Sequence, residues 1–398
     1  MPISRREFIV ATSSALAGVA VASTRAGVSS APRWIVINLR GGIDGLATVV
    51  PYGDPAYRTQ RGALAIGEPG DPSGSHDLNG FFGLHPAAAS LASLYRSAEL
   101  AIVPAVSPAL VTRSHFDAQK ALDLGQGIAL NRRVGWLNRA LALTPKSRRP
   151  DGYAMALGHS MPLVLQGGEP ATSWSPRRQP TADADTYERL RALYDDDSFL
   201  AAQLERAESA AEMVGGMSRD MRGQRRDGTA LFSAAGNLLG RPDGPRVLVL
   251  DMHGWDTHAN QGGATGRLSR RIGQLASGIA TLREGAGSMW ASTAGIIVSE
   301  FGRTVRANGT RGTDHGTAGM AMLFGGAIRG QQVVGEWPGV HASSLWEGRD
   351  LRPTVDVRSL YVSVFAPHFN IAPERMASTV FDDPSIAVIP DLHRRDMA

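Results

Sequence analysis

Residues 34–39 read Trp-Ile-Val-Ile-Asn-Leu, and this short apolar, β-branched run decides the fold class. Its length and the Arg-Gly-Gly that follows at residues 40–42 favour a buried strand over a helix. Similar runs lie at residues 100–106, 246–251 and 293–299. Continuous apolar strands separated by helical segments are typical of a parallel sheet covered on both faces. The sequence therefore predicts an α/β fold with three αβα layers and a mostly parallel central sheet.

The segments between and after these strands carry helical patterns, at residues 86–97, 116–124, 185–215, 228–239, 264–284 and 356–365. The helix at 266–283 joins the third and fourth strands, so they form a βαβ unit whose crossover should be right-handed. Residues 142–185 and 304–350 read as loop-rich. We expect one domain over residues 32–398, in which residues 142–245 form an insertion or cap beside the site.

The N-terminus has the pattern of an export signal. Residues 4–9 read Ser-Arg-Arg-Glu-Phe-Ile, and small and apolar residues follow as far as residue 26. This order predicts a cleavable twin-arginine signal over residues 1–26, with a disordered basic tail as the alternative. The apolar stretch is too short for a stable membrane span, which needs about 20 apolar residues. We therefore expect the twin-arginine machinery to export the folded protein to the periplasm or the medium.

Composition excludes several classes of site. The chain has no Cys, so disulfides, thiolate metal sites and cysteine nucleophiles are excluded. Its formal net charge is +4, and its arginine pairs are scattered and lack interleaved aromatic residues. This pattern argues against nucleic acid as a partner.

Acidic and histidine side chains gather in three segments of the last third of the chain, at residues 251–258, 299–304 and 313–316. Each segment follows a predicted strand, directly or after a short loop. Ligands of open α/β sheets bind beyond the carboxyl ends of the strands. Because carboxylates and imidazoles bind divalent metal ions, the segments predict a metal site at this edge.

Asp256 and His258 are the first candidate ligands. Residues two apart point the same way from an extended backbone, so both side chains could face one ion. His253, directly before Gly254-Trp255 at the exit of the predicted strand, strengthens the pattern. The alternative is a polar loop in which the Asp caps a turn.

Glu300, Asp314 and His315 complete the late candidates. Glu300 follows the fourth strand, and Arg303 beside it could bind an anionic oxygen; a structural Glu300–Arg303 ion pair is the alternative. His315 is a candidate ligand, with Asp314 either a second ligand or the partner that orients the ring. The alternative for Asp314 and His315 is a tight turn.

Two candidates precede these segments. Asp44 lies in a glycine-rich turn that lacks the endings of nucleotide-binding loops, and it could reach the same edge or be solvated. Ser114 and Asp117 have the spacing of a helix-capping pair, yet a Ser at a helix start near a metal is also a candidate nucleophile. His115 could act as a ligand or as an acid–base group.

Together these motifs resemble a bacterial family of twin-arginine-exported proteins of unknown function that is grouped with the alkaline-phosphatase and sulfatase superfamily. The resemblance extends from the turn at residues 39–45 to the predicted helix near Tyr361. Its most specific pieces are residues 113–117, 254–258, 299–304 and 313–316.

The resemblance implies an alkaline-phosphatase-like fold and the hydrolysis, or transfer, of a phosphate or sulfate group. It implies an acid after the first strand, a hydroxyl nucleophile at the helix after the second strand, and late acid and His ligands. These places are occupied, in order, by Asp44, Ser114, Asp256, His258, Glu300 and His315. The metal would act as a Lewis acid, and Arg303 or Arg113 would steady the anion. Two departures stand out. Glu300 replaces an adjacent Asp-His pair, and Ser114 lacks the Pro and Arg context of a formylglycine sulfatase.

The sequence thus favours an exported metal-dependent hydrolase acting on a small-molecule or polymer-borne anionic ester. Zinc or manganese suits mixed His and carboxylate ligands, whereas calcium would suit a more oxygen-rich site. The alternatives are a non-catalytic envelope binding or accessory protein that retains a structural metal, and an envelope protein that binds no metal.

Overall fold

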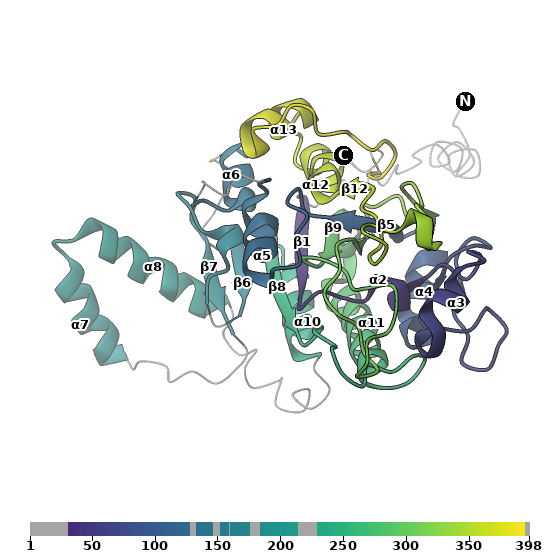
Figure 1. Cartoon of the computed structure of the whole chain (residues 1–398). Helices are drawn as coiled ribbons and strands as arrows, with labels where there is room; N and C mark the ends of the chain where they lie inside the picture. Colours follow the sequence, from purple (N-terminus) through teal and green to yellow (C-terminus); the bar gives the residue numbers. More distant parts are fainter. Residues whose placement is uncertain are drawn as a thin grey trace, which may run out of the picture. The chain divides into compact units, whose positions relative to one another are not determined.

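The strand predicted at residues 34–39 forms β1 (Arg33–Arg40), inside the central sheet (Figure 1). β8 (Val247–His253) and β9 (Thr293–Val298) pair with it in parallel, one on each side. The computed structural model describes residues 31–127, 133–145, 152–158, 160–175, 184–213 and 229–394. The export signal predicted at residues 1–26 therefore lies outside the described residues.

The described residues form a nine-stranded sheet in the order β11-β5-β10-β9-β1-β8-β6-β7, in which β12 also pairs with β5. The remaining strands are β5 (Leu100–Ser107), β6 (Ala154–Leu157), β7 (Thr172–Trp174), β10 (Gly319–Phe324), β11 (Gln332–Val333) and β12 (Val355–Asp356). Each described pairing is parallel except those of β10, which runs antiparallel to β5 and β9. The predicted α/β class with a mostly parallel sheet is confirmed.

β10 corrects one prediction, because it lies in residues 304–350, which read as loop-rich. Met320, Met322 and Phe324 pack into one layer of the core, and Ala321 and Leu323 pack into the other. A six-residue apolar run that is buried on both faces shows no alternation and sits among glycines, so its sequence signal is weak.

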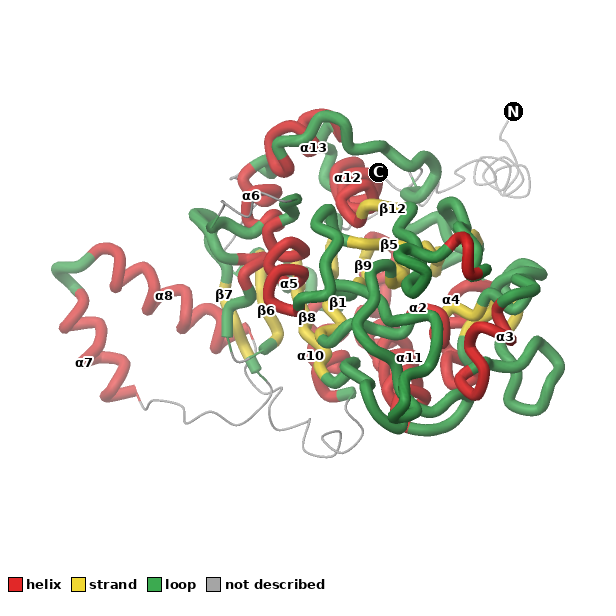
Figure 2. Tube along the Cα trace, viewed as in Figure 1, coloured by secondary structure: helices red, strands yellow, loops and turns green. Residues whose placement is uncertain are grey.

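Side chains of β1 alternate between the two core layers, as the period of a strand requires. Trp34 and Val36 pack with α6 (Trp136–Ala142), α12 (Val357–His368) and α13 (Pro373–Phe381). Ile35 and Ile37 pack with α4 (Ala89–Arg96), α10 (Ala230–Leu239) and α11 (Arg267–Ala286). Strands therefore lie between two helical layers, as Figure 2 shows in yellow and red, and the three-layer prediction holds.

A second, antiparallel sheet of three short strands lies outside this arrangement: β2 (Val49–Val50), β4 (Gly83–Leu84) and β3 (His76–Asp77). Two short helices belong to the same part of the chain. α2 (Gly45–Thr48) directly precedes β2, and α3 (Tyr57–Arg61) lies between β2 and β3.

The helix predicted at residues 185–215 is two helices, α7 (Ala184–Tyr194) and α8 (Ser198–Met213). The Asp197 carboxylate accepts the backbone N–H groups of Phe199 and Leu200, each at 3.0 Å, so it caps a new helix start. Among the described residues, no helix combines the length and apolar character needed to cross a membrane.

Parts of residues 142–245, the segment predicted to form an insertion or cap, belong to the main fold. β6 and β7 belong to the central sheet beside β8, and α10 packs on α11 in a covering layer. Only α7 and α8 remain as the described part of a candidate insertion. The described residues, α7 and α8 included, fall in one compact unit, and an insertion or cap within it stays a prediction.

Candidate metal centre

Three neighbouring parallel strands bring the predicted site segments to one edge of the sheet. β9, β1 and β8 are consecutive, so their carboxyl ends lie side by side. Gly41 follows β1, Asp256 lies in the loop after β8, and Glu300 lies just past β9. The backbone N–H of Gly41 donates to Oε1 of Glu300 at 2.8 Å, which joins two of these ends directly.

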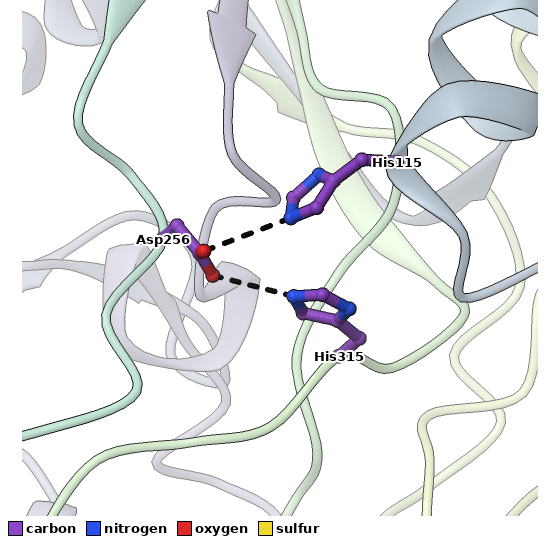
Figure 3. A group of neighbouring side chains, drawn as sticks. All are labelled: His115, Asp256 and His315. Carbon is purple, nitrogen blue, oxygen red and sulfur yellow. Dashed lines mark hydrogen bonds and ion pairs between the residues drawn. The ribbon is translucent and has the colours of Figure 1, made fainter.

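His115, Asp256 and His315 form a group that could hold a metal ion. Each offers one ligand atom, and these atoms all lie within 4.8 Å of one another. Figure 3 shows both imidazoles turned toward the Asp256 carboxylate from different segments. His115 is the first residue of α5 (His115–Leu124), and His315 comes from the loop after Glu300. The structure therefore contains a possible His and Asp site for a divalent metal.

His258 adjoins this group. Its Nε2 lies 2.9 Å from Nε2 of His315 and 3.0 Å from Oδ1 of Asp256. Asp256 and His258, the Asp-x-His pair that the sequence singled out, therefore lie side by side in this group. The other histidine of that segment, His253, is exposed at the end of β8 and is not part of the group.

Each of the three rings presents its Nδ1 to an oxygen that can only accept. Nδ1 of His115 lies 3.0 Å from Oε1 of Glu300. Nδ1 of His258 lies 3.2 Å from Oδ1 of Asp314, and Nδ1 of His315 lies 3.0 Å from the carbonyl oxygen of Arg113. A ring that donates from Nδ1 keeps the Nε2 lone pair for a metal, which is how protein partners orient metal-binding histidines.

This orientation makes the centre suited to a cation. The Nε2 atoms of His258 and His315 lie 2.9 Å apart, and they lie 3.0 and 3.3 Å from Oδ1 of Asp256. Burial, together with the charges of His115 and Arg303, lowers the pKa of His315, so protonation of that ring is disfavoured. A metal ion shared by these three atoms would accept a lone pair from each of them.

Glu300 orients His115 from behind. Burial would raise the pKa of this carboxyl, but hydrogen bonds from His115, Gln119 and Gly41 outweigh it and lower the pKa to about 2. The Gln119 amide donates to Oε1 at 2.9 Å. Glu300 in turn raises the pKa of His115 through their hydrogen bond. Glu300 therefore contacts the candidate ligand His115 and is not itself a member of the group that His115, Asp256 and His315 form.

Asp314 contacts a different ring from the one that the sequence suggested, because it faces His258 rather than His315. Its Oδ1 accepts from His258 and, at 2.9 Å, from the Asn308 amide. Asp314 is thus the orienting partner of His258, and it lies outside the group that His115, Asp256 and His315 form.

Arg303 is not available to bind an anion. It is buried, and all of its guanidinium contacts are with protein acceptors. These acceptors are the Asp256 carboxylate and the carbonyl oxygens of Gly41, Gly42, Trp255 and Thr313. Although burial opposes ionisation of Asp256, Arg303 and the neighbouring histidines lower its pKa. We therefore revise the predicted anion-binding role of Arg303 to a positioning role.

The glycines after β1 allow this close packing. Gly41 and Gly42 have positive φ angles of 123° and 70°. A Cβ on Gly41 would lie 2.6 Å from the backbone nitrogen of Asp256, so only glycine lets the turn approach the Asp256 loop. The turn that the sequence identified therefore positions Asp256, not Asp44.

The structure places Asp44 away from the metal-binding group. Its buried carboxylate accepts from the Arg61 guanidinium, from the Gln261 amide at 2.6 Å and from the backbone of Ala47 at the start of α2. Both carboxylate oxygens are thus engaged by protein donors. We revise Asp44 from metal ligand to a structural ion pair and helix cap.

Arg113 and Ser114 also have structural partners. The Arg113 guanidinium donates to Asp350 at 2.7 Å and to Glu347 at 2.8 Å. The Ser114 hydroxyl caps α5 by accepting the backbone N–H of Asp117 at 3.4 Å. Ser114 therefore forms the helix cap that the sequence suggested, and its role as a nucleophile stays a prediction.

Sequence reasoning did not single out Gln119, which donates to Glu300. A helical signal could have found it, because His115 and Gln119 are four residues apart on α5 and so lie on one helix face. Gln261 was also missed: its amide joins Asp44 to the hydroxyl groups of Thr257 and Thr313.

Replacing Glu300 with Gln should weaken metal binding by about 10–100-fold, because the partner that orients His115 loses its charge. Calorimetric titration of the metal-free protein with zinc measures this effect. Glu99→Gln is the matched control, since Glu99 pairs with Arg283 rather than with the histidines. Equal zinc affinity in Glu300→Gln and wild type would contradict the role of Glu300.

The low pKa of Glu300 also predicts a pH dependence of stability. The folded-state pKa is about 2 and the ordinary value is 4.5, so its contribution is complete above about pH 4.5 and is lost as the pH falls toward 2. In metal-free protein, the stability difference between wild type and Glu300→Gln should narrow by about 2 kcal/mol from pH 7 to pH 3. Urea unfolding at the two pH values measures it, and a constant difference would contradict the assignment.

Comparison with solved structures finds distant likenesses. The C-terminal periplasmic domain of EcEptC from Escherichia coli, solved as a complex with Zn, aligns with a TM-score of 0.35 and 10% identity over 74% of this chain and 73% of that one. The PsFucS1 sulfatase from Pseudoalteromonas sp. aligns with a TM-score of 0.37 and 13% identity over 92% and 74%. Likeness at this level says nothing about the reaction.

No curated protein matches the chain. A family match, in contrast, covers residues 85–380, which include α5, the loop after β8 and the loop between β9 and β10. All four residues of the candidate centre, at positions 115, 256, 258 and 315, lie within it. By this match the chain belongs to the family described as "Protein of unknown function (DUF1501)".

Proposed function

We propose that this protein is an exported metal-dependent hydrolase, or a transferase of the same group, that acts on a phosphate or sulfate ester. One observation carries the proposal: His115, His258 and His315 turn their Nε2 atoms toward Asp256, and each ring is held from behind by an acceptor. Carboxylate and imidazole ligands oriented in this way are those of metal sites that activate a water or hydroxyl group. The ester class rests on the sequence motifs.

The ligand chemistry favours zinc, with manganese as the alternative. Three imidazole nitrogens and one carboxylate suit a borderline metal that accepts nitrogen ligands. Calcium prefers six to eight oxygen ligands, and the nearby carboxylates of Glu300 and Asp314 are engaged by ring nitrogens and amides. These contacts argue against an oxygen-rich site.

A bound metal would polarise the ester and lower the pKa of an attacking hydroxyl. Ser114 precedes His115 at the N-terminus of α5, so it would hold its hydroxyl next to a ligand in the chain. Its Oγ accepts a hydrogen bond from Asp117, which leaves the hydroxyl proton available for donation or removal. Asp256, fixed by Arg303, would keep the ligand group in place during the reaction.

Export rests on residues 1–26 and is part of the proposal. Twin-arginine transport carries folded proteins, so a centre built from α5 and two distant loops could receive its metal before export. Residues 1–26 would then be removed, and the enzyme would act in the periplasm or the medium.

The purified protein should contain about one zinc or manganese ion per chain by elemental analysis, and should hydrolyse an aryl phosphate or an aryl sulfate. Removing the metal with a chelator should lower turnover by at least about 100-fold, and added zinc should restore it. His315→Ala should lose both metal and activity. His341→Ala is the control, because His341 is an exposed helix cap elsewhere.

The outcomes separate the alternatives. Metal without turnover of any aryl ester would favour a non-catalytic binding or accessory protein that retains a structural ion. Protein with neither metal nor affinity for zinc would overturn the metal centre itself.

Ser114 is tested with variants that separate the nucleophile from the helix cap. Ser114→Asn retains a capping side chain but has no hydroxyl, so it should lose hydrolysis, keep its metal and unfold at nearly the wild-type temperature. Ser114→Ala should lose hydrolysis and also about 1 kcal/mol of stability. Steady-state turnover, metal content and thermal unfolding measure the three properties. Persistent activity in Ser114→Asn would leave Ser114 as a helix cap alone.

A further inference from the structure

Three arginines contact the residues around the metal centre, and their availability to a ligand differs. Arg303 is buried and donates to five protein acceptors. Arg113 donates to Asp350 and Glu347 at 2.7 and 2.8 Å. Arg349, which the sequence patterns did not single out, has a side chain that is 46% exposed.

The Arg349 guanidinium lies beside His315 of the centre and beside Asp314, which orients His258, and it makes only long contacts. Nη2 is 3.4 Å from the carbonyl oxygen of His315 and 4.0 Å from Oδ2 of Asp314. Nε is 3.7 Å from Oδ1 of Asp350. Among the described residues, these are its side-chain contacts, so most of its N–H donors can be offered to a ligand at little cost in protein hydrogen bonds.

Asp350 provides an unused anchor for this side chain. The residue is fully buried, and its Oδ1 has no hydrogen-bond partner within the described part of the chain. A buried acceptor without a donor is unfavourable by about 1–3 kcal/mol. A small movement of Arg349 Nε toward Oδ1 would complete this bond, so that Asp350 would orient the guanidinium.

The backbone beneath Arg349 is held in place although the side chain is not. The Arg349 N–H donates to the carbonyl oxygen of Trp346 at 3.1 Å, and its own carbonyl oxygen accepts from Val305 at 3.2 Å. Trp346 and Asp350 also form an antiparallel bridge. The turn therefore delivers a long, adaptable cation to a constant position next to His315.

We propose that Arg349 binds the anionic group of the substrate at the metal centre, with Asp350 as its positioning residue. The inference rests on the proposed function, because it requires an anion to come to the centre. A guanidinium suits this task, since its planar donors match two oxygens of a phosphate or sulfate group. Its contacts with the His315 backbone and with Asp314 bring this charge next to the proposed ligand His315 and to the partner of His258. This assigns to Arg349 the role that the sequence assigned to Arg303 or Arg113.

The test measures anion binding apart from turnover. Zinc-loaded wild type, Arg349→Ala, Arg349→Lys and Arg352→Ala are titrated with inorganic phosphate and inorganic sulfate by calorimetry. Arg352 is the matched control: it is an exposed arginine three residues along, and it lies over the Trp346 ring at 5.7 Å. Zinc content is measured for every variant, which shows whether the centre remains intact.

Arg349→Ala should bind the preferred anion at least about 10-fold more weakly, because charge-assisted hydrogen bonds are lost. Arg349→Lys should lie between it and wild type, Arg352→Ala should match wild type, and zinc content should not change. With a hydrolysed ester, Arg349→Ala should raise KM.

Equal anion affinity in wild type and Arg349→Ala would overturn the assignment, as would a wild type that binds neither anion. If phosphate or sulfate binds through Arg349 but no ester is hydrolysed, the anion site stands and the hydrolase proposal fails. If esters are hydrolysed equally well by Arg349→Ala, the hydrolase proposal stands and the role of Arg349 fails.

Discussion

The buried guanidinium of Arg303 is the contact on which the candidate centre depends. It joins the turn after β1, the loop after β8 and the loop between β9 and β10, through the carbonyl oxygens of Gly41, Gly42, Trp255 and Thr313. It also binds the Asp256 carboxylate. A buried guanidinium is stable only when its N–H groups have hydrogen-bond acceptors. Because these acceptors come from the turn and both loops, the position of each depends on the positions of the other two.

A second set of contacts orients the three histidine rings of the candidate centre. Glu300, Asp314 and the Arg113 carbonyl each fix one imidazole, and they come from three different segments of the chain. The same kind of contact is made three times, with two carboxylates and one backbone oxygen as acceptors. The histidines therefore face inward because of their hydrogen-bond partners, independently of any single element of secondary structure.

The sequence predicted the strands well and the division of roles among polar residues poorly, for a physical reason. The apolar runs that became β1, β5, β8 and β9 report burial directly, since both faces of each strand are covered. Asp44 resembled a ligand because its partner Arg61 belongs to a short helix that no pattern connects to it. Whether a carboxylate binds a metal, a ring nitrogen or a guanidinium depends on which loops meet, and local patterns do not contain that information.

The sites of histidine and acid clusters, in contrast, could be predicted from their place after strands. Asp256, His258 and His315 do meet, and Glu300 contacts His115 of the same group. The sequence left His115 open between ligand and acid–base group, because a histidine in the first turn of a helix is compatible with both. Its ring is directed by Glu300, which is 185 residues away in the chain.

The reversed direction of β10 has a consequence for the loop that carries His315. Because β10 runs against its neighbour β9, the chain leaves the sheet and returns to it at the same rim, without crossing to the far side. Residues 299–318 thus form a loop between two adjacent strands, and Arg303 and His315 form an antiparallel bridge across its base. The tip of this loop, at residues 306–312, packs back on the loop after β8: the Asn308 amide donates to the carbonyl oxygen of His258 and to Asp314, and the Thr310 hydroxyl donates to the same carbonyl oxygen. A change in the length of the tip would therefore shift the backbone that carries His258.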